Sequence, residues 1–373
     1  MSGDFTREEG LAALLAGTGL EWAPGPGGTY VVQSTALAQA TPDAPVPAGE
    51  QPVELDPIIV TAQPLEQGFK ANMQETATKT PLSIRETPQS VSVITQDSLK
   101  ARQTQDLGQA LETAAGVFQF SGTGPFAGKT AFGFDQITVR GIVLDGYFSV
   151  LEDGFISPTF FSKPDLAIYE RVEVVKGPSS TLYGRGSPGG LVNRVRKKPL
   201  PEFRAEVSAS VGSFDTYRLD VDITGPLFAS ESAGGRMVVA YEDAGAFVDG
   251  VESERILAAP SLALDLTDST RLLLQGTYQE DSFIPNPGFP LVFDNGKFRA
   301  PDIRRSLFVG TPNDDENEWE LLTGTAQLEQ ALGDNWPATL KFNRSSQDSQ
   351  IDLDSYAYGI SPTGDVGLYS SAY

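Results

Sequence analysis

Two charged groups in the middle of the chain have the residue types that proton transfer needs. Arg140 precedes Gly141, and Glu170, Arg171 and Glu173 lie within four positions of one another. Carboxylates beside guanidinium groups could serve as general acids, general bases and electrophiles. The alternative is a buried network in which neighbouring charges compensate each other. We favour the network, and predict that Arg140, Glu170, Arg171 and Glu173 lock a domain in place by exchangeable ion pairs.

The amino-acid composition excludes most other classes of catalytic site. The 373 residues include no Cys and no His, which excludes disulfides, Ser-His and Cys-His nucleophile pairs, and zinc sites built on these ligands. A formal net charge of -22 argues against a nucleic-acid partner. The glycine-rich run 184–190 lacks the Lys-Ser/Thr ending of a phosphate-binding loop, and we expect tight turns there. We therefore predict no enzyme, no catalytic residue, no metal site and no cofactor.

The elements that hold the two charged groups belong to a compact α/β segment, predicted as a domain over residues 80–199. Strands are expected at 90–94, 137–139 and 172–175. A helix is expected from 107 to about 114, with Thr104 as its N-cap and Gly116 at its end.

From residue 200 onward the pattern changes to alternation of apolar and polar residues. Seven strands of about 10 residues are expected, with short turns alternating with one long polar loop over 281–316. Such strands occur in transmembrane β-barrels, where the apolar face meets lipid, and in soluble β-sandwiches. Alternation alone does not distinguish a transmembrane β-barrel from a soluble β-sandwich.

The N-terminal part contains smaller units. Residues 1–33 suggest a short helix from Thr6 and two strands at 20–22 and 29–32, and residues 34–79 form a flexible linker. No signal peptide and no helical membrane span is visible in the sequence. The linker contains one apolar island, composed of Asp56, Pro57, Ile58, Ile59, Val60, Thr61 and Ala62.

Several motifs in order then resemble the TonB-dependent siderophore receptors. They lie at 87–95, 107–117, 137–141, 153–154, 170–184, 187–193, 197–199, 224–227 and 259–262. The resemblance covers about residues 56–373. It implies an α/β plug domain followed by an incomplete antiparallel transmembrane β-barrel, about the first third of a barrel with roughly 22 strands. Two departures from the family pattern are local: Thr113-Ala114-Ala115 replaces its Asn-Val-Pro, and Asn193 to Pro199 replaces its Ile-Val-Thr-Lys-Lys-Pro. The larger departure is length, and we expect the chain to be a piece of such a receptor, truncated at both ends.

The resemblance also implies partners. Asp56–Ala62 would be the TonB box, which adds a strand to the periplasmic protein TonB, and residues 1–33 would be the remnant of a signalling domain that contacts an inner-membrane anti-sigma regulator. The ligand would be a ferric siderophore, and the location the outer membrane of a Gram-negative bacterium, in contact with its lipid. Aromatic side chains of the outward plug loops would stack on the chelate; the candidates are Phe118, Phe120, Phe126, Tyr147, Phe160 and Phe161.

Three alternatives remain at this stage. The ligand could be vitamin B12 or another metal chelate. The chain could signal as well as transport. Because about seven strands cannot close a barrel of this size, the chain could also be a truncated piece or relic that does not transport by itself.

Overall fold

The computed structural model describes 15 segments of the chain: residues 20–24, 30–34, 68–104, 106–121, 135–144, 148–157, 164–227, 232–284, 292–294, 297–299, 302–308, 317–333, 336–350, 353–360 and 366–371. The chain forms two compact units, Met1–Ile58 and Ile59–Tyr373. In the first, β1 (Leu20–Pro24) and β2 (Tyr30–Ser34) pair as an antiparallel hairpin, where two strands were predicted. The predicted helix from Thr6 and the apolar island Asp56 to Ala62 lie outside the described residues.

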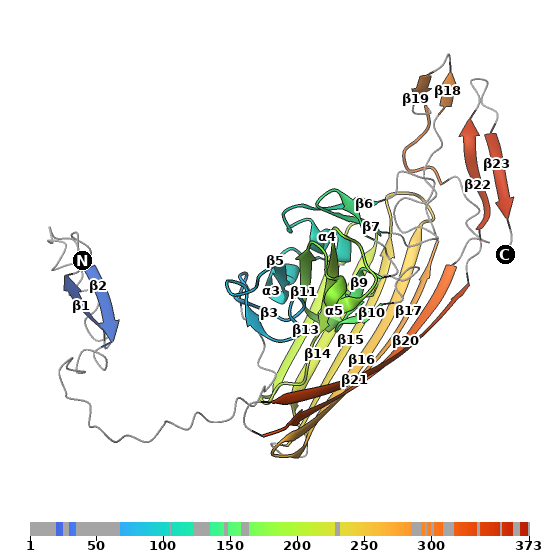
Figure 1. The fold of residues 1–373 in the computed structure, drawn as a ribbon. Helices are drawn as coiled ribbons and strands as arrows, with labels where there is room; N and C mark the ends of the chain where they lie inside the picture. The colour runs from blue at the N-terminus through green and yellow to red at the C-terminus, as the bar shows by residue number, and fades with distance from the viewer. Residues whose placement is uncertain are drawn as a thin grey trace, which may run out of the picture. The chain divides into compact units, whose positions relative to one another are not determined.

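A five-stranded mixed sheet forms the centre of the α/β domain (Figure 1). Its order is β10 (Phe155–Ile156), β9 (Val150–Glu152), β12 (Gly190–Arg196), β11 (Tyr169–Lys176) and β5 (Ser90–Thr95). β11 is antiparallel to both neighbours, and β12 runs parallel to β9. Side chains of β11 are buried on both faces, Val172 and Val174 in one cluster and Val175 in another. Burial on both faces explains why β11 does not alternate strictly and has the two apolar residues Val174 and Val175 side by side.

Short elements surround this sheet. They are the hairpin of β3 (Met73–Gln74) and β4 (Leu82–Ser83), the helices α3 (Gln96–Ala101), α4 (Leu107–Leu111) and α5 (Ser180–Tyr183), the 3-10 helix η2 (Leu166–Ile168), and a small sheet of β6 (Val117–Ser121), β7 (Asp135–Val139) and β8 (Ile142–Val143).

The predicted N-cap of α4 is wrong. Asp106, and not Thr104, caps this helix: its side chain accepts a hydrogen bond from the Gln109 backbone N–H at 2.9 Å. The backbone N–H of Thr104 instead donates to the Leu99 carbonyl and closes the end of α3. Asp106 is one residue before the helix and places its carboxylate where the free N–H groups lie.

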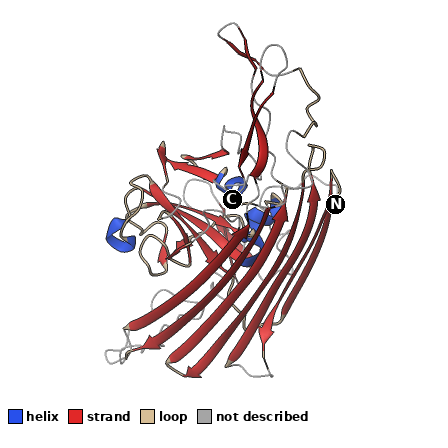
Figure 2. Cartoon of the chain, turned by 90° about the vertical axis from the view of Figure 1, so that its right-hand side faces the viewer, coloured by secondary structure: helices blue, strands red, loops and turns tan. Residues whose placement is uncertain are grey.

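Seven long strands form an antiparallel sheet, which we call the wall (Figure 2). They are β13 (Arg204–Gly212), β14 (Thr216–Pro226), β15 (Ala233–Gly245), β16 (Glu252–Thr267), β17 (Thr270–Phe283), β20 (Asn317–Ala331) and β21 (Pro337–Gln350). Each strand pairs with the one before it in this order. Between β17 and β20 the chain forms β18 (Val292–Asp294) and β19 (Lys297–Arg299), which share a separate four-stranded sheet with β22 (Leu353–Ile360) and β23 (Val366–Ser371).

The wall has the opposite distribution of apolar and polar side chains from a soluble sheet: its exposed outer face is apolar, and its buried inner face is polar. Large apolar side chains on its outer face are exposed, among them Val207 at 66%, Leu322 at 54% and Phe342 at 65%. Polar side chains on its inner face are buried, and Gln279 is 0% exposed. A soluble β-sandwich buries its apolar face, so this arrangement excludes the sandwich and gives the wall of a β-barrel.

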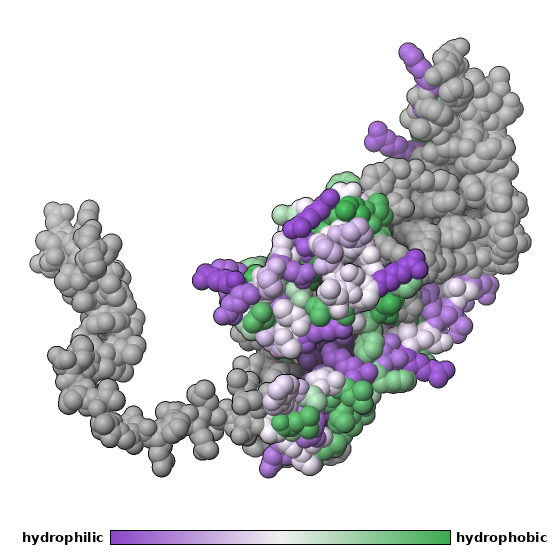
Figure 3. All heavy atoms as spheres, in the orientation of Figure 1, coloured by the Kyte–Doolittle hydropathy of each residue, from purple (hydrophilic) through white to green (hydrophobic). Residues whose placement is uncertain are grey.

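Figure 3 shows the hydropathy of the described residues on one face of the molecule. Hydrophilic residues project from the α/β domain, and hydrophobic residues gather on the lower part of the wall in this view. Among the described residues, no helix is both long and apolar enough to cross a membrane.

Candidate functional site

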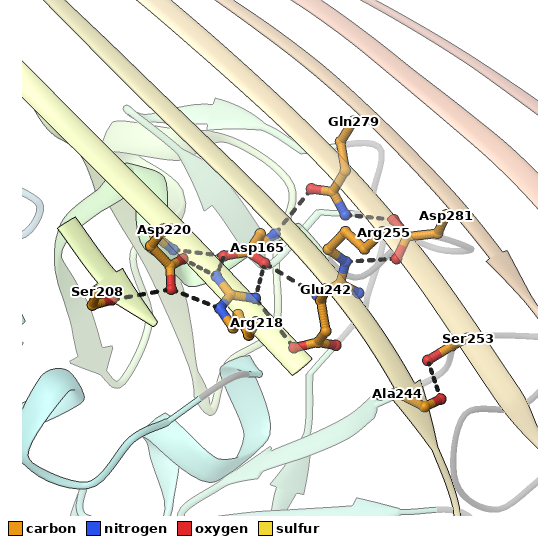
Figure 4. Close-up of polar contacts among 11 residues, drawn as sticks. Asp165, Ser208, Arg218, Asp220, Glu242, Ala244, Ser253, Arg255, Gln279 and Asp281 are labelled. Atoms are coloured by element: carbon orange, nitrogen blue, oxygen red, sulfur yellow. Dashed lines mark hydrogen bonds and ion pairs between the residues drawn. The ribbon is translucent and has the colours of Figure 1, made fainter. Parts of the chain in front are cut away.

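The inner face of the wall holds the α/β domain through Asp165, which lies one residue before η2. Its Oδ1 accepts the Ala167 backbone N–H at 2.8 Å and thereby caps η2. Arg218 of β14 donates from both terminal nitrogens to the same carboxylate, at 2.8 and 2.9 Å, and Arg255 of β16 donates at 3.3 Å (Figure 4). Burial alone would raise the pKa of Asp165, but the two guanidinium groups lower it to about 2. Asp165 is therefore ionised at neutral pH and joins the domain to two wall strands.

The wall supplies its own carboxylates to the same arginines. Arg218 also contacts Asp220 at 2.5 Å and Glu242 at 3.2 Å, and Arg255 contacts Asp281 at 2.6 Å. Gln279 connects both sides, because its Oε1 accepts the Asp165 backbone N–H and its Nε2 donates to Asp281. Each arginine thus keeps a wall partner when Asp165 leaves. The contact can be exchanged without leaving a buried guanidinium unpaired.

A second anchor lies at the end of the α/β domain. Lys197 donates to Asp222 of β14 at 2.8 Å, and Arg236 of β15 donates to both oxygens of the same carboxylate at 2.7 Å. The Arg236 guanidinium also donates to the Lys198 carbonyl, and the Gln275 amide donates to the Lys197 carbonyl. These contacts fix the last residues of the domain on three wall strands.

The predicted charged group around Arg171 lies inside the domain. Glu173 is fully buried and accepts hydrogen bonds from Arg171 Nε at 2.5 Å and from the backbone N–H groups of Glu75 and Thr76 at 3.1 and 2.8 Å. Terminal nitrogens of Arg171 lie 3.4 Å from Glu75 and 3.8 Å from Glu170. Burial opposes the charge of Arg171, but the surrounding carboxylates raise its pKa. All three carboxylates contact the one Arg171 guanidinium group, so these residues form a buried structural network.

This network ties the hairpin of β3 and β4, which we call the N-terminal hairpin (residues 73–83), to the central sheet. Besides Glu173, the Tyr183 hydroxyl donates to the Thr76 carbonyl at 2.8 Å, and the Asn193 amide donates to Thr76 Oγ1 at 2.9 Å. Side chains from β11, α5 and β12 therefore converge on one turn of the hairpin.

Arg140 lies apart from this group. Arg140 and Gly141 form the two-residue turn between β7 and β8, and both have positive φ, 54° and 78°. Within the described part of the chain, no carboxylate lies within ion-pair distance of Arg140. Its charge instead adds to burial in lowering the pKa of Lys176.

Few of the aromatic ligand candidates can be placed. Phe118 lies on β6 and is 62% exposed. Phe120 lies on the same strand, but its side chain is not described, and Phe126, Tyr147, Phe160 and Phe161 lie outside the described residues. The grouping of these six aromatic residues therefore stays a prediction.

Comparison with known proteins identifies the fold. Residues 83–191 match the TonB-dependent Receptor Plug Domain. The chain belongs to the TonB-dependent receptor family. The α/β domain is its plug, and the wall is the first part of its β-barrel, as predicted. The family consists of receptors that are not enzymes and resides in the Gram-negative outer membrane, so these two predictions are confirmed as well.

Particular receptors show how far the similarity extends. The metal-pseudopaline receptor CntO of Pseudomonas aeruginosa is 35% identical over 318 residues, 83% of this chain and 42% of that protein. The ferric-pyoverdine BN7/BN8 receptor of Pseudomonas putida is 27% identical over 98% of this chain and 43% of its own length. The solved pyoverdine outer membrane receptor of Pseudomonas aeruginosa PAO1 is 27% identical, with a TM-score of 0.71 over 81% of this chain and 44% of that one. The chain thus spans about two fifths of the length of the curated relatives it matches.

The plug–wall anchors of this receptor chain were missed by the sequence reasoning. A usable signal was present, because Arg218, Asp220 and Asp222 alternate with apolar residues along β14. Charges on the inner face of a barrel strand need partners, and the plug supplies some of them.

Proposed function

We propose that this chain is part of a TonB-dependent receptor that imports a ferric siderophore across the outer membrane. The observation that carries the proposal is the seating of the plug on the wall through Asp165, Arg218 and Arg255. A plug held by exchangeable ion pairs closes the barrel at rest and can shift without breaking a covalent bond. The curated relatives, whose names specify ferric pyoverdine, support a siderophore as the ligand.

The energy for this movement would come from TonB. In this proposal the TonB box is Asp56–Ala62, within the linker predicted over residues 34–79, and the plug predicted over 80–199 precedes a barrel that begins at 200. Because residues 73–79 belong to the N-terminal hairpin, which is bonded to the central sheet, the linker in this proposal ends before Met73 and the plug includes the hairpin. Tension on the linker reaches the N-terminal hairpin first, because this hairpin is the first described element of the plug. Its attachment through Glu173 to β11 would carry the pull into the plug.

The chelate would be recognised by aromatic side chains of the outward plug loops. Phe118 supports this proposal, since it is a large apolar side chain left exposed on the plug. The siderophore supplies the ligands of the iron, so the protein would contact the chelate and not the metal.

A second candidate ligand is a chelate of another metal. The relative with 35% identity is named a metal-pseudopaline receptor, which favours this alternative. Residues 1–33 would add signalling to an inner-membrane anti-sigma regulator. The ferric-pyoverdine receptor that aligns with 98% of the chain supports an N-terminal region shared with such receptors.

Deletion of the gene in its bacterium tests these proposals. We expect loss of growth on one siderophore under iron limitation, with loss of ⁵⁵Fe uptake from that chelate. Uptake of chelated ⁶⁵Zn or ⁶³Ni, measured in parallel, distinguishes the second candidate. A gene copy with Val60→Pro should fail to restore uptake, because proline cannot donate a strand hydrogen bond to TonB. Unchanged uptake of every chelate would overturn transport and favour a relic.

A further inference from the structure

One row of residues across the outer face of the wall changes from uncharged to acidic. The strand register places these residues opposite one another on successive strands: Ala209, Leu219, Tyr241, Ile256, Glu280, Glu320 and Asp348. The members on β13 to β16 are uncharged, and those on β17, β20 and β21 are carboxylates. A carboxylate is costly in hydrocarbon and is tolerated at the polar edge of the membrane. The membrane boundary therefore crosses this row between β16 and β17.

The tilt of the strands sets the slope of this boundary across the wall. Adjacent strands lie about 4.8 Å apart and barrel strands tilt by about 40°, so a level boundary moves about 4 Å, slightly more than one residue, along each successive strand. On β15 it passes between Tyr241 and Asp243, an exposed carboxylate that was not used to place it. On β14 it lies about three residues beyond Leu219, and on β13 about four beyond Ala209. Both positions coincide with the turn of residues 213–215, which joins the two strands.

The outer face of this first wall hairpin, β13 and β14, is apolar up to the turn. In residues 204–226, all of which the structure describes, the outer face carries no charged side chain before the turn, and Val211 is 77% exposed there. The turn itself contains Asp215, which is also exposed. An apolar face that ends at one exposed carboxylate agrees with a boundary at this level.

The turn places an aromatic pair on the outer side of the wall. Gly245 lies on the outer face of β15, two positions after Asp243. A Cβ added to Gly245 would meet the Phe214 carbonyl oxygen at 2.5 Å and the Phe214 Cβ at 3.9 Å, so Phe214 lies over this face. The Phe214 ring packs edge-on against Phe247, with centroids 6.1 Å apart, and both residues are 53% exposed. Phe214 has a φ of 61°, where large side chains are rare, so backbone conformation does not explain its presence.

We propose that Phe214 and Phe247 lie in the membrane interface, where they bind the boundary between the lipid headgroups and the hydrocarbon. Aromatic rings favour this region. Tyr217, 50% exposed on the outer face of β14, connects the pair to the apolar face below, which favours lipid over a soluble ligand. The first hairpin thus ends at the membrane surface, whereas β20 and β21 continue beyond it. The inference goes beyond transport, since it depends only on a wall that lies in the membrane.

Spin labels on single cysteines test this position, because the chain has no native Cys. Phe247→Cys carries a nitroxide in the chain folded into phospholipid vesicles, and its collisions with oxygen and with a water-soluble nickel chelate are compared. Oxygen dissolves in lipid and the chelate does not, so the oxygen-to-chelate ratio should be at least about threefold higher at Phe247→Cys than at Asp249→Cys. Asp249 is the matched control, because it follows two residues later and its side chain is 56% exposed.

A third label site shows whether the wall has entered the lipid. Val211→Cys, on the outer face of β13, should give a ratio at least as high as that of Phe247→Cys. Equal ratios at Phe247→Cys and Asp249→Cys, with a high ratio at Val211→Cys, would place the aromatic pair in water and overturn the proposal. A low ratio at Val211→Cys as well would contradict the lipid-facing wall itself, and the proposal with it.

Discussion

At the scale of single residues, Asp165 carries much of the attachment between plug and wall. Asp165→Asn keeps the shape of the side chain but removes the charge that faces Arg218 and Arg255. We expect the free energy of unfolding to fall by about 2–4 kcal/mol, because two buried guanidinium groups lose a shared partner. Urea denaturation of the chain in detergent micelles measures this loss.

A matched substitution on the surface separates burial from simple loss of charge. Asp249 also pairs with an arginine, Arg304, but its side chain is 56% exposed. Asp249→Asn should cost less than about 1 kcal/mol. Equal effects of the two substitutions would show that Asp165 is not an anchor.

The carboxylate of Asp165 also makes the free energy of unfolding depend on pH. The pKa of Asp165 falls from 3.8 to about 2 in the folded state, so its contribution is complete above about pH 4. The contribution is lost as the pH falls from about 4 to about 2, and it amounts to roughly 2 kcal/mol. Denaturation at several pH values should show this loss in the wild-type chain and a flatter profile in Asp165→Asn.

Only some of the residues that form buried ion pairs could be predicted from the sequence. Glu170, Arg171 and Glu173 stand together in the sequence, and their grouping already indicated an ion-pair network. Asp165 gave no such sign, since its partners Arg218 and Arg255 are 53 and 90 residues away. Arg140 was grouped with them by residue type, but its place in a two-residue turn keeps it apart.

At the scale of elements, the N-terminal hairpin depends on Glu173. Glu173→Gln places an amide against Arg171 and weakens the bonds to the backbone N–H groups of Glu75 and Thr76. Amide hydrogen exchange in residues 73–83 should become at least about tenfold faster. Mass spectrometry of peptides from this hairpin measures the rate.

Glu206→Gln is the matched control for this substitution. Glu206 pairs with Lys100 across the plug and the wall, but both side chains are more than one third exposed. Exchange in the N-terminal hairpin should therefore stay at the wild-type rate. Acceleration by both variants would indicate general loosening of the plug.

Elements with strong periodicity were predictable, and short ones were not. All seven wall strands were expected from alternation, because each is long and has one apolar face. The six-residue helix α3 gave no periodic signal and was missed. The N-cap of α4 was misplaced by two residues, because Thr104 and Asp106 are both good capping residues.

At the scale of the whole molecule, the exposed apolar face of the wall should meet lipid. Leu322→Arg places a charge within β20, on this face, and should cost about 2–4 kcal/mol for folding into phospholipid vesicles. Leu332→Arg introduces the same charge at a similarly exposed leucine in the turn after β20 and should cost less than about 1 kcal/mol. Equal costs for the two variants would contradict a lipid-facing wall.

The architecture as a whole was only partly accessible from sequence. Alternation predicted strands but could not decide between lipid and water outside the sheet. The deciding observation is spatial: Gln279 and Asp281 are buried against the plug, while Leu322 and Phe342 are exposed. Which face the plug covers depends on contacts between residues far apart in the chain.

The strand order also has a consequence for how the molecule is assembled. Every wall strand pairs with the wall strand before it along the chain, and the one long connection is that of residues 284–316, which contain β18 and β19, between β17 and β20. Pairing between neighbours in sequence closes short loops and carries a small entropic cost. The wall can therefore grow by one hairpin after another during export, with the plug, which lies nearer the N-terminus, available as a template from the start.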